Sequence, residues 1–273
     1  GKSPDYKGPY SDYPAFDAVL QAMGGLMHRI GTADGPPLLG VAGTVDRVTS
    51  MVTAFGIASA LFQRERTGKG QFVDVAMYDV AVALNCTAVA QYSYSGEVLT
   101  RGKEELYAPS GALKTRDGYV GVIVPNDLMW KRFCEAIGHP EFAEDPKGIG
   151  SRNRARHYKE HFQPVVDQWM SEHTSDEVVE IFLRHNIPIG KVQTSKDLFE
   201  CPQLRARNML VEIEDPVAGK HKFANSPVRF SDAPKDVRFR TVPELGEHND
   251  EVYRNLLNLH PQEIEQLAKE KII

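Results

Sequence analysis

The chain has 273 residues, of which 41% are hydrophobic and 25% are charged, and its formal net charge is −5 at pH 7. These proportions are those of an ordinary folded protein, and they exclude a disordered, collagen-like or low-complexity chain. The acidic balance argues against a chain-wide basic surface for nucleic acid or an anionic membrane, and we expect no apolar run long enough to span a bilayer.

The first hundred residues alternate between turn-rich segments and periodic apolar patterns. The predicted elements are helices over 16–30, 46–66 and 79–94 and a strand over 71–77. Gly24-Gly25 interrupts the first helix, which indicates a close approach of its backbone to another segment. Gly68 suits the C-cap of the second helix. This order of elements indicates an α/β layer.

Beyond residue 100 the pattern changes to a hairpin followed by helices. Two strands over 112–124 are expected to flank a turn at Arg116-Asp117-Gly118. The further predicted elements are helices over 128–137, 153–170 with a kink near Pro164, 175–185, 195–199, 250–257 and 261–269, and strands over 209–214 and 221–223. Thr174-Ser175-Asp176-Glu177 forms a capping box before the helix over 175–185.

The composition shifts near residues 100 and 205, which divides the chain into three predicted parts. Residues 1–100 are expected to belong to a larger domain and residues 101–204 to form a small α+β domain. Residues 205–273 are expected to be a linker and a return to the larger domain.

The three cysteines indicate the redox compartment. Cys86, Cys134 and Cys201 are odd in number and far apart, and they form no CxxC motif or Cys/His cluster. We therefore expect reduced thiols in a reducing, cytoplasmic compartment and no metal site.

Asp46 is the residue that most invites a chemical interpretation. It lies at the predicted start of a long apolar helix, after the small residues Gly43 and Thr44. The pattern alone favours a helix N-cap, which is a common role for aspartate. A carboxylate kept ionised by a helix N-terminus could also attack an acyl carbon and form a covalent intermediate.

Long ordered motifs then point to a family. GPYSDYPAFDAVLQAMGGLM at 8–27, GTADGPPLLGVAGTVDRV at 31–48, APSGALKTRDGYVGV at 108–122 and LGEHNDEVYRNLL at 245–257 resemble family III CoA-transferases, the formyl-CoA transferase-like or CaiB/BaiF family. The resemblance covers nearly the whole chain. It implies an incomplete Rossmann-like large domain, a small α+β domain and an interlocked homodimer.

The resemblance also implies a reaction and its residues. The family's nucleophilic aspartate corresponds to Asp46, which would be cap and nucleophile together and would form an aspartyl anhydride and then an aspartyl-CoA thioester. Backbone N–H groups would stabilise the oxyanion of each step. Ser50 stands where the family often has glycine. A loop near Glu105 to Pro109 would cover the site.

Substrate and CoA contacts are expected from Phe16, Gly31, Tyr107, Ala108 and Pro109. Coenzyme A would enter as a substrate, as acyl-CoA, and no tightly bound cofactor is expected. The glycine-rich loop of formyl-CoA transferases is replaced here by GKEELYAPSG. That departure argues against formate and oxalate and for a larger acyl group, such as the short dicarboxylate succinyl.

Two alternatives stay open. The α-methylacyl-CoA racemase branch pairs the same aspartate with a histidine, and this chain has Phe16 at the histidine position, so a two-base proton transfer lacks its partner. The second alternative is a non-catalytic fragment or subunit, because the family's usual N-terminal segment has no counterpart here and another chain would have to supply it.

Overall fold

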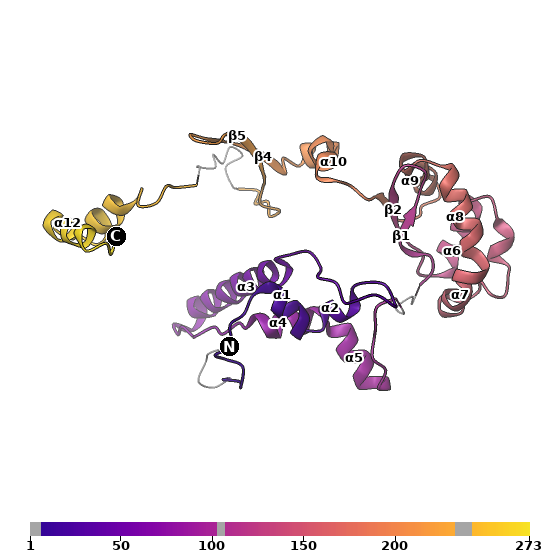
Figure 1. Cartoon of the computed structure of the whole chain (residues 1–273), viewed down its shortest axis with the longest axis horizontal. Coiled ribbons are helices and arrows are strands. Elements are labelled where there is room, and N and C mark those ends of the chain that lie inside the picture. The colour runs from indigo at the N-terminus through magenta and orange to yellow at the C-terminus, as the bar shows by residue number, and fades with distance from the viewer. Residues whose placement is uncertain (1–6, 103–106, 233–241) are drawn as a thin grey trace. The chain divides into compact units, whose positions relative to one another are not determined.

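The computed structural model describes residues 7–102, 107–232 and 242–273. The chain divides into two units, Gly1–Lys191 and Val192–Ile273 (Figure 1). The fold is mixed α/β, as expected, and the predicted domain limits at residues 100 and 204 stay predictions. The described strands pair only in antiparallel fashion, so the Rossmann-like domain also stays a prediction.

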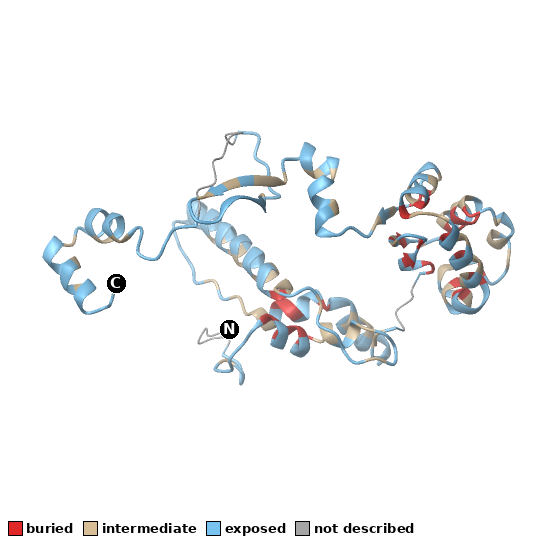
Figure 2. Cartoon of the chain, turned by 45° about the horizontal axis from the view of Figure 1, so that its top comes forward, coloured by how far each residue is buried: buried red, intermediate tan, exposed pale blue. Residues whose placement is uncertain are grey.

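Residues 7–102 form helices and loops. The helices are α1 (Asp17–Met23), α2 (Leu26–Arg29), α3 (Thr44–Thr67), α4 (Met77–Leu84) and α5 (Cys86–Ser95). The predicted break at Gly24-Gly25 separates α1 from α2. A Cβ atom on Gly24 would lie 2.5 Å from the Cβ atom of Ala81 in α4, so the expected close approach is confirmed. Leu20, Val45 and Ala81 form a small core where α1, α3 and α4 meet (Figure 2).

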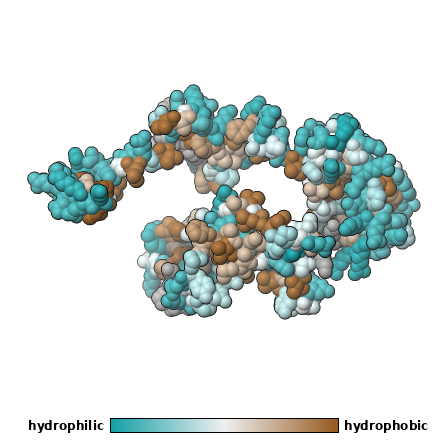
Figure 3. All heavy atoms as spheres, viewed as in Figure 1, coloured by the Kyte–Doolittle hydropathy of each residue, from teal (hydrophilic) through white to brown (hydrophobic). Residues whose placement is uncertain are grey.

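Helix α3 is long and largely exposed. Val45 is its one buried residue, and Gly68 ends it in the left-handed conformation, as the sequence predicts. By length and composition α3 could cross a membrane, which corrects the expectation that no run would be long enough. A single helix of this kind is weak support for a membrane span, because core helices of soluble proteins have the same length and composition. Apolar side chains gather on the part of the chain that holds α3 (Figure 3).

Two predictions for this region are wrong. The segment over 71–77 is not a strand: it runs without regular structure from Gln71 to Ala76, and α4 begins at Met77. Its alternation has no neighbouring strand to pair with among residues 7–102. The predicted single helix over 79–94 is two helices, broken at Asn85. The Asn85 amide donates to the Gly24 carbonyl at 3.0 Å and its oxygen accepts from Arg29 at 3.0 Å.

Residues 107–191 hold the larger core. Strands β1 (Ser110–Lys114), β2 (Tyr119–Ile123) and β3 (Ile189–Lys191) form an antiparallel sheet in the order β1-β2-β3. The predicted hairpin is confirmed, with Ser110 opposite Ile123 and Lys114 opposite Tyr119. One face of the sheet packs on a cluster of buried side chains from the helices that follow, among them Trp130, Phe133, Phe162 and Phe182.

The helices of this core follow the predicted order with one difference. They are α6 (Asp127–Ala136), the 3-10 turn η2 (Pro140–Ala143), α7 (Ser151–His157), the π-helical segment η3 (Tyr158–Phe162), α8 (Gln163–Glu172) and α9 (Ser175–Arg184). The predicted helix over 153–170 is interrupted by η3, which ends just before Pro164. Pro164 occupies the first turn of α8, where its missing N–H is tolerated. The capping box before α9 is confirmed.

The second unit has no buried residue among those described. It contains α10 (Ser195–Glu200), α11 (Pro202–Ala206), the hairpin β4 (Leu210–Asp215) and β5 (Gly219–Ala224), the π-helical η4 (Asp250–Leu256) and α12 (Pro261–Lys269). Apart from α11, which the sequence analysis does not predict, these positions match the predicted elements within a few residues.

Candidate functional site

Asp46 lies in the first turn of α3, but it is not the helix cap. The helix begins at Thr44, and its N-cap is Gly43, whose φ of 76° is the left-handed conformation that favours glycine. Asp46 is therefore the third residue of the helix, and it is exposed. Within the described residues its carboxylate has no hydrogen bond or ion pair. The prediction that Asp46 also caps the helix is wrong.

The capping role belongs to Asp17, which α1 brings to the start of α3. Its carboxylate accepts from the backbone N–H of Gly43 at 2.9 Å and from that of Val45 at 2.7 Å, across 28 residues of sequence in the second case. Asp17 is 8% exposed. Burial by itself would raise the pKa of this carboxyl, but hydrogen bonds from Gly43, Val45, Gln21 and the Asp46 N–H together hold its pKa below the ordinary value.

Gln21 fixes both Asp17 and the loop that leads into α3. It lies one helical turn after Asp17 and is 2% exposed. Its Nε2 donates to Asp17 Oδ2 at 2.8 Å and to the Val41 carbonyl at 3.2 Å. Its Oε1 accepts from the Gly40 N–H at 3.1 Å. All the polar atoms of this buried amide are thus used to hold the backbone just before Asp46.

The first turn of α3 is consequently not a free set of N–H donors. Gly43 and Val45 donate to Asp17, and the Thr44 N–H donates to the Val41 carbonyl at 3.2 Å. The expectation that backbone N–H groups stabilise an oxyanion stays a prediction. The carboxylate that caps α3 comes from another helix, α1.

Two neighbours of Asp46 complete the local geometry. The Arg47 guanidinium bends back over the start of the helix and donates to the Ala42 carbonyl at 2.9 Å. A Cβ atom on Gly43 would lie 3.2 Å from its Cζ atom, so a larger residue at 43 would displace this cation. Ser50 stands where the family often has glycine, and its hydroxyl donates to the Asp46 carbonyl at 2.9 Å without interrupting α3.

Phe16 and Gly31 lie in the same part of the chain as Asp46. Phe16 is the N-cap residue of α1 and is 76% exposed, one position before Asp17. Gly31 has a φ of 128°, and a Cβ atom there would lie 2.9 Å from the Pro36 carbonyl oxygen. Gly31 therefore fits its tight loop only as glycine. No contact of the described residues joins Gly31 to Asp46.

Tyr107, Ala108 and Pro109 belong to the part of the chain with the larger core. The Ala108 carbonyl accepts from Nε of the fully buried Arg154 at 2.7 Å, and the Pro109 carbonyl accepts from the Val124 N–H at 3.0 Å. The end of the predicted loop is thus anchored to the core, while its residues 103–106 lie outside the described residues. Their expected meeting with Asp46 stays a prediction.

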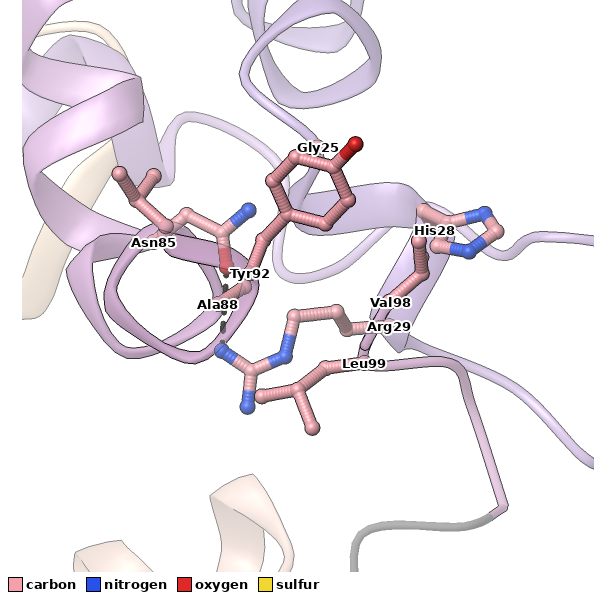
Figure 4. Close-up of a pocket in the computed structure, with 9 residues that line it drawn as sticks. Gly25, His28, Arg29, Asn85, Ala88, Tyr92, Val98 and Leu99 are labelled. Carbon is pink, nitrogen blue, oxygen red and sulfur yellow. Dashed lines mark hydrogen bonds between the residues drawn. The ribbon is translucent and has the colours of Figure 1, made fainter. Parts of the chain in front are cut away.

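A pocket of about 380 Å³ lies elsewhere, between α2 and α5. In Figure 4 the Arg29 guanidinium, hydrogen-bonded to Asn85, lies beside Tyr92 and Leu99 at this pocket. Asp46 does not line it. No group of three or more His, Cys, Asp or Glu residues that could hold a metal occurs in the described part of the chain.

Sequence reasoning found Asp46 and missed Asp17 and Gln21. The signal was present as an acidic and an amide residue four positions apart in one predicted helix, on a face that also carries Leu20. In the first turn of a helix, however, an aspartate is explained by the helix dipole alone. The partner of Asp17, the start of α3, is not visible in the local pattern.

Comparisons with known proteins agree on one group. The profile described as CoA-transferase family III matches residues 4–249. A formyl-CoA:oxalate CoA-transferase from Streptomyces coelicolor is 36% identical, over 98% of this chain and 69% of that protein. A succinyl-CoA–D-citramalate CoA-transferase from Chloroflexus aurantiacus is 32% identical, over 97% of this chain and 66% of that protein.

A solved structure has the same fold. The crystal structure of a CAIB/BAIF family protein from Brucella suis matches with a TM-score of 0.76 and 27% identity, over 92% of this chain and 65% of that one. The chain therefore spans about two thirds of the length of the proteins it matches.

Proposed function

The chain belongs to CoA-transferase family III, and we propose that it transfers coenzyme A between an acyl-CoA thioester and a free carboxylic acid, with Asp46 as the nucleophile. Members of this family use CoA thioesters as substrates. The observation that carries the proposal is the exposed Asp46 carboxylate in the first turn of α3, beside donors already occupied by Asp17. An ionised carboxylate without competing donors can attack an acyl carbon.

The reaction passes through three covalent intermediates on Asp46: an anhydride, a thioester and a second anhydride. Its carboxylate attacks the thioester carbonyl, the C–S bond breaks, and a mixed anhydride forms as the CoA thiolate leaves. The thiolate attacks the aspartyl carbonyl, which gives an aspartyl-CoA thioester and releases the first acid. The acceptor carboxylate attacks this thioester and forms a new anhydride with release of thiolate. The thiolate then attacks the acyl carbon of the new anhydride, giving the new acyl-CoA and free Asp46.

For the substrates we propose a dicarboxylic acid longer than oxalate, such as succinic acid, and its CoA thioester. The relative from Chloroflexus aurantiacus is named for succinyl-CoA and D-citramalate. The relative from Streptomyces coelicolor is named for formyl-CoA and oxalate, but the segment 102–111 of this chain, GKEELYAPSG, departs from the glycine-rich loop of formyl-CoA transferases. A panel of carboxylate acceptors with succinyl-CoA as donor separates the two groups: exchange into oxalate alone would contradict the proposal.

Trapping of the aspartyl intermediate tests the nucleophile. The intact protein is incubated with succinyl-CoA and quenched with hydroxylamine, and the peptide containing Asp46 is analysed by mass spectrometry. We expect a hydroxamate on Asp46 and, in Asp46→Asn, loss of the adduct and a fall in turnover of at least about 10³-fold, because no other group replaces a covalent nucleophile.

Asp79 provides the matched control. It is also exposed and also the third residue of a helix, α4, in the same part of the chain. Asp79→Asn should retain the adduct and the turnover. A fully active Asp46→Asn variant would contradict the proposed role of Asp46 as the nucleophile. Deuterium uptake at the α-carbon of an acyl-CoA in the absence of any acceptor acid would instead favour a racemase.

A further inference from the structure

Three helices of this chain show one thing that an acidic third residue can do at a helix start. Glu177 in α9, Asp197 in α10 and Glu263 in α12 each occupy this position, and each carboxylate accepts from the backbone N–H of its own N-cap residue at 2.7 Å. This back-bonding is one half of a capping box. A carboxylate held in this way has one oxygen engaged by its own backbone.

Within the described residues, Asp46 in α3 and Asp79 in α4 occupy the same position without this bond, and at α3 the N-cap N–H is already engaged. The N–H that Asp46 would accept from belongs to Gly43, and that N–H donates to Asp17 Oδ2 at 2.9 Å. The neighbouring Val45 N–H also donates to Asp17, to Oδ1 at 2.7 Å. A carboxylate from α1 therefore occupies the N-cap donor that would otherwise hold Asp46.

We propose that Asp17 is a positioning residue that keeps the Asp46 carboxylate free of its own helix, so that both of its oxygens stay available to an acyl-CoA thioester. The proposal rests on the proposed role of Asp46 as the nucleophile. Asp17 itself does not touch the reacting atoms. It acts by satisfying the helix start from a buried position, where Gln21 holds its Oδ2 at 2.8 Å.

Gln21 belongs to the same hydrogen-bond network at the start of α3. Its amide orients Asp17 and, through Gly40 and Val41, fixes the loop that delivers Gly43 to the cap. Loss of this amide leaves the charge of Asp17 in place but removes the hydrogen bond that fixes the orientation of its carboxylate. A Gln21 variant is therefore expected to produce the same defect as an Asp17 variant, in weaker form.

The test compares Asp17→Ala, Asp17→Asn and Gln21→Met with the unaltered protein and with Asp12→Asn, an exposed aspartate of the same segment. Labelling of carboxylates with a water-soluble carbodiimide and glycine ethyl ester is measured at Asp46 and Asp79. In Asp17→Ala we expect the Asp46:Asp79 labelling ratio to fall at least threefold, toward the ratio for the back-bonded Asp197. Asp17→Asn retains one acceptor oxygen and should show a partial fall.

Kinetics with succinyl-CoA provide the second readout. Asp17→Asn is expected to lower kcat by about 10- to 100-fold, the scale of a misplaced reacting group, with the KM for succinyl-CoA within about twofold. A role in folding alone would lower the amount of active protein and the thermal midpoint but would leave the labelling ratio of the folded fraction unchanged. If Asp17→Ala does not fold, Gln21→Met decides on the same two readouts.

Each outcome has one meaning. An unchanged Asp46:Asp79 ratio in the folded variants overturns the positioning role, whatever the kinetics. A ratio that falls while Asp46→Asn retains full turnover upholds the positioning role at the helix start and contradicts only the proposed nucleophile. Asp12→Asn should match the unaltered protein in both readouts.

Discussion

Asp17 shows how a buried charge can be retained at low cost. Its carboxylate is removed from water, which disfavours the ionised form, but it accepts hydrogen bonds from two backbone N–H groups and from the Gln21 amide. These donors lie at the positive end of the α3 dipole, which favours a negative charge. The net result is a lowered pKa in spite of burial.

The lowered pKa of Asp17 predicts a pH dependence of folding stability. The folded-state pKa is depressed, so its contribution is fully present above the ordinary aspartate pKa and is lost as the pH falls through that value toward the folded-state pKa. The free energy of unfolding, measured in urea between pH 7 and pH 3, should therefore favour the unaltered protein over Asp17→Asn most strongly at pH 7.

The same variant isolates Asp17 from other carboxyls with lowered pKa values, such as Asp117 and Asp145, because these titrate in both proteins. The difference between the two proteins should shrink as the pH falls below about 4. A difference that is constant over this range would contradict an ionised Asp17 in the folded protein.

For single residues, the sequence predicts the place in a helix better than the hydrogen bonds that the residue makes. Asp46 was placed near the start of a helix by the apolar period that follows it, and the structure has it in the first turn. Its interpretation as the cap failed because a cap from 28 residues away leaves no local pattern. The family role of Asp46 rests on resemblance and stays a prediction, as do the roles of Phe16, Gly31 and Tyr107 to Pro109.

Among the elements, those with their own local signals were predicted closely. The capping box at Thr174, the turn at Asp117 and the Gly68 cap depend on neighbouring residues, and each is where the sequence predicts it. The two wrong predictions, a strand over 71–77 and a continuous helix over 79–94, concern segments whose structure is decided by contacts with distant residues. The first has no strand beside it in its part of the chain, and the second is broken where the Asn85 amide reaches Gly24.

The capping box of α9 leads to a prediction for the larger core. Thr174 Oγ1 accepts from the Glu177 N–H at 3.2 Å, and the helix it starts buries Val178 and Phe182. Thr174→Ala should therefore lower the free energy of unfolding by about 1 kcal/mol, measured by urea titration of Trp fluorescence. Both tryptophans, Trp130 and Trp169, lie in or against this core.

Thr194→Ala is the matched control, since Thr194 forms the same capping box at α10, a helix with no buried residue. It should change the same transition by less than about 0.5 kcal/mol. Equal losses in the two variants would show that the α9 box has no special link to the core.

The whole molecule distributes its core unevenly. The large buried cluster, including Trp130, Phe133, Phe162 and Phe182, lies within residues 108–187, whereas the second cluster consists of Leu20, Val45 and Ala81. A part of a chain folds independently only if it buries enough apolar surface to offset the loss of chain entropy. Residues 107–191 are thus expected to fold independently more readily than residues 7–102.

We predict that residues 107–191, produced as a separate polypeptide, fold with a single cooperative unfolding transition. Circular dichroism and tryptophan fluorescence should give coincident urea curves. A polypeptide of residues 7–102 provides the comparison and should unfold with a smaller amplitude and at lower urea concentration. Non-coincident curves for 107–191 would show that its core depends on the rest of the chain.

The link between Asp17 and α3 has a consequence for biosynthesis. Asp17 precedes Val45 by 28 residues, so at about 5–20 residues per second it leaves the ribosome about 1–6 s earlier. The cap of α3 is therefore already in the nascent chain when the helix it caps is made. A circular permutant in which α1 follows α3 would reverse this order and leave the first turn of a long apolar helix uncapped during translation.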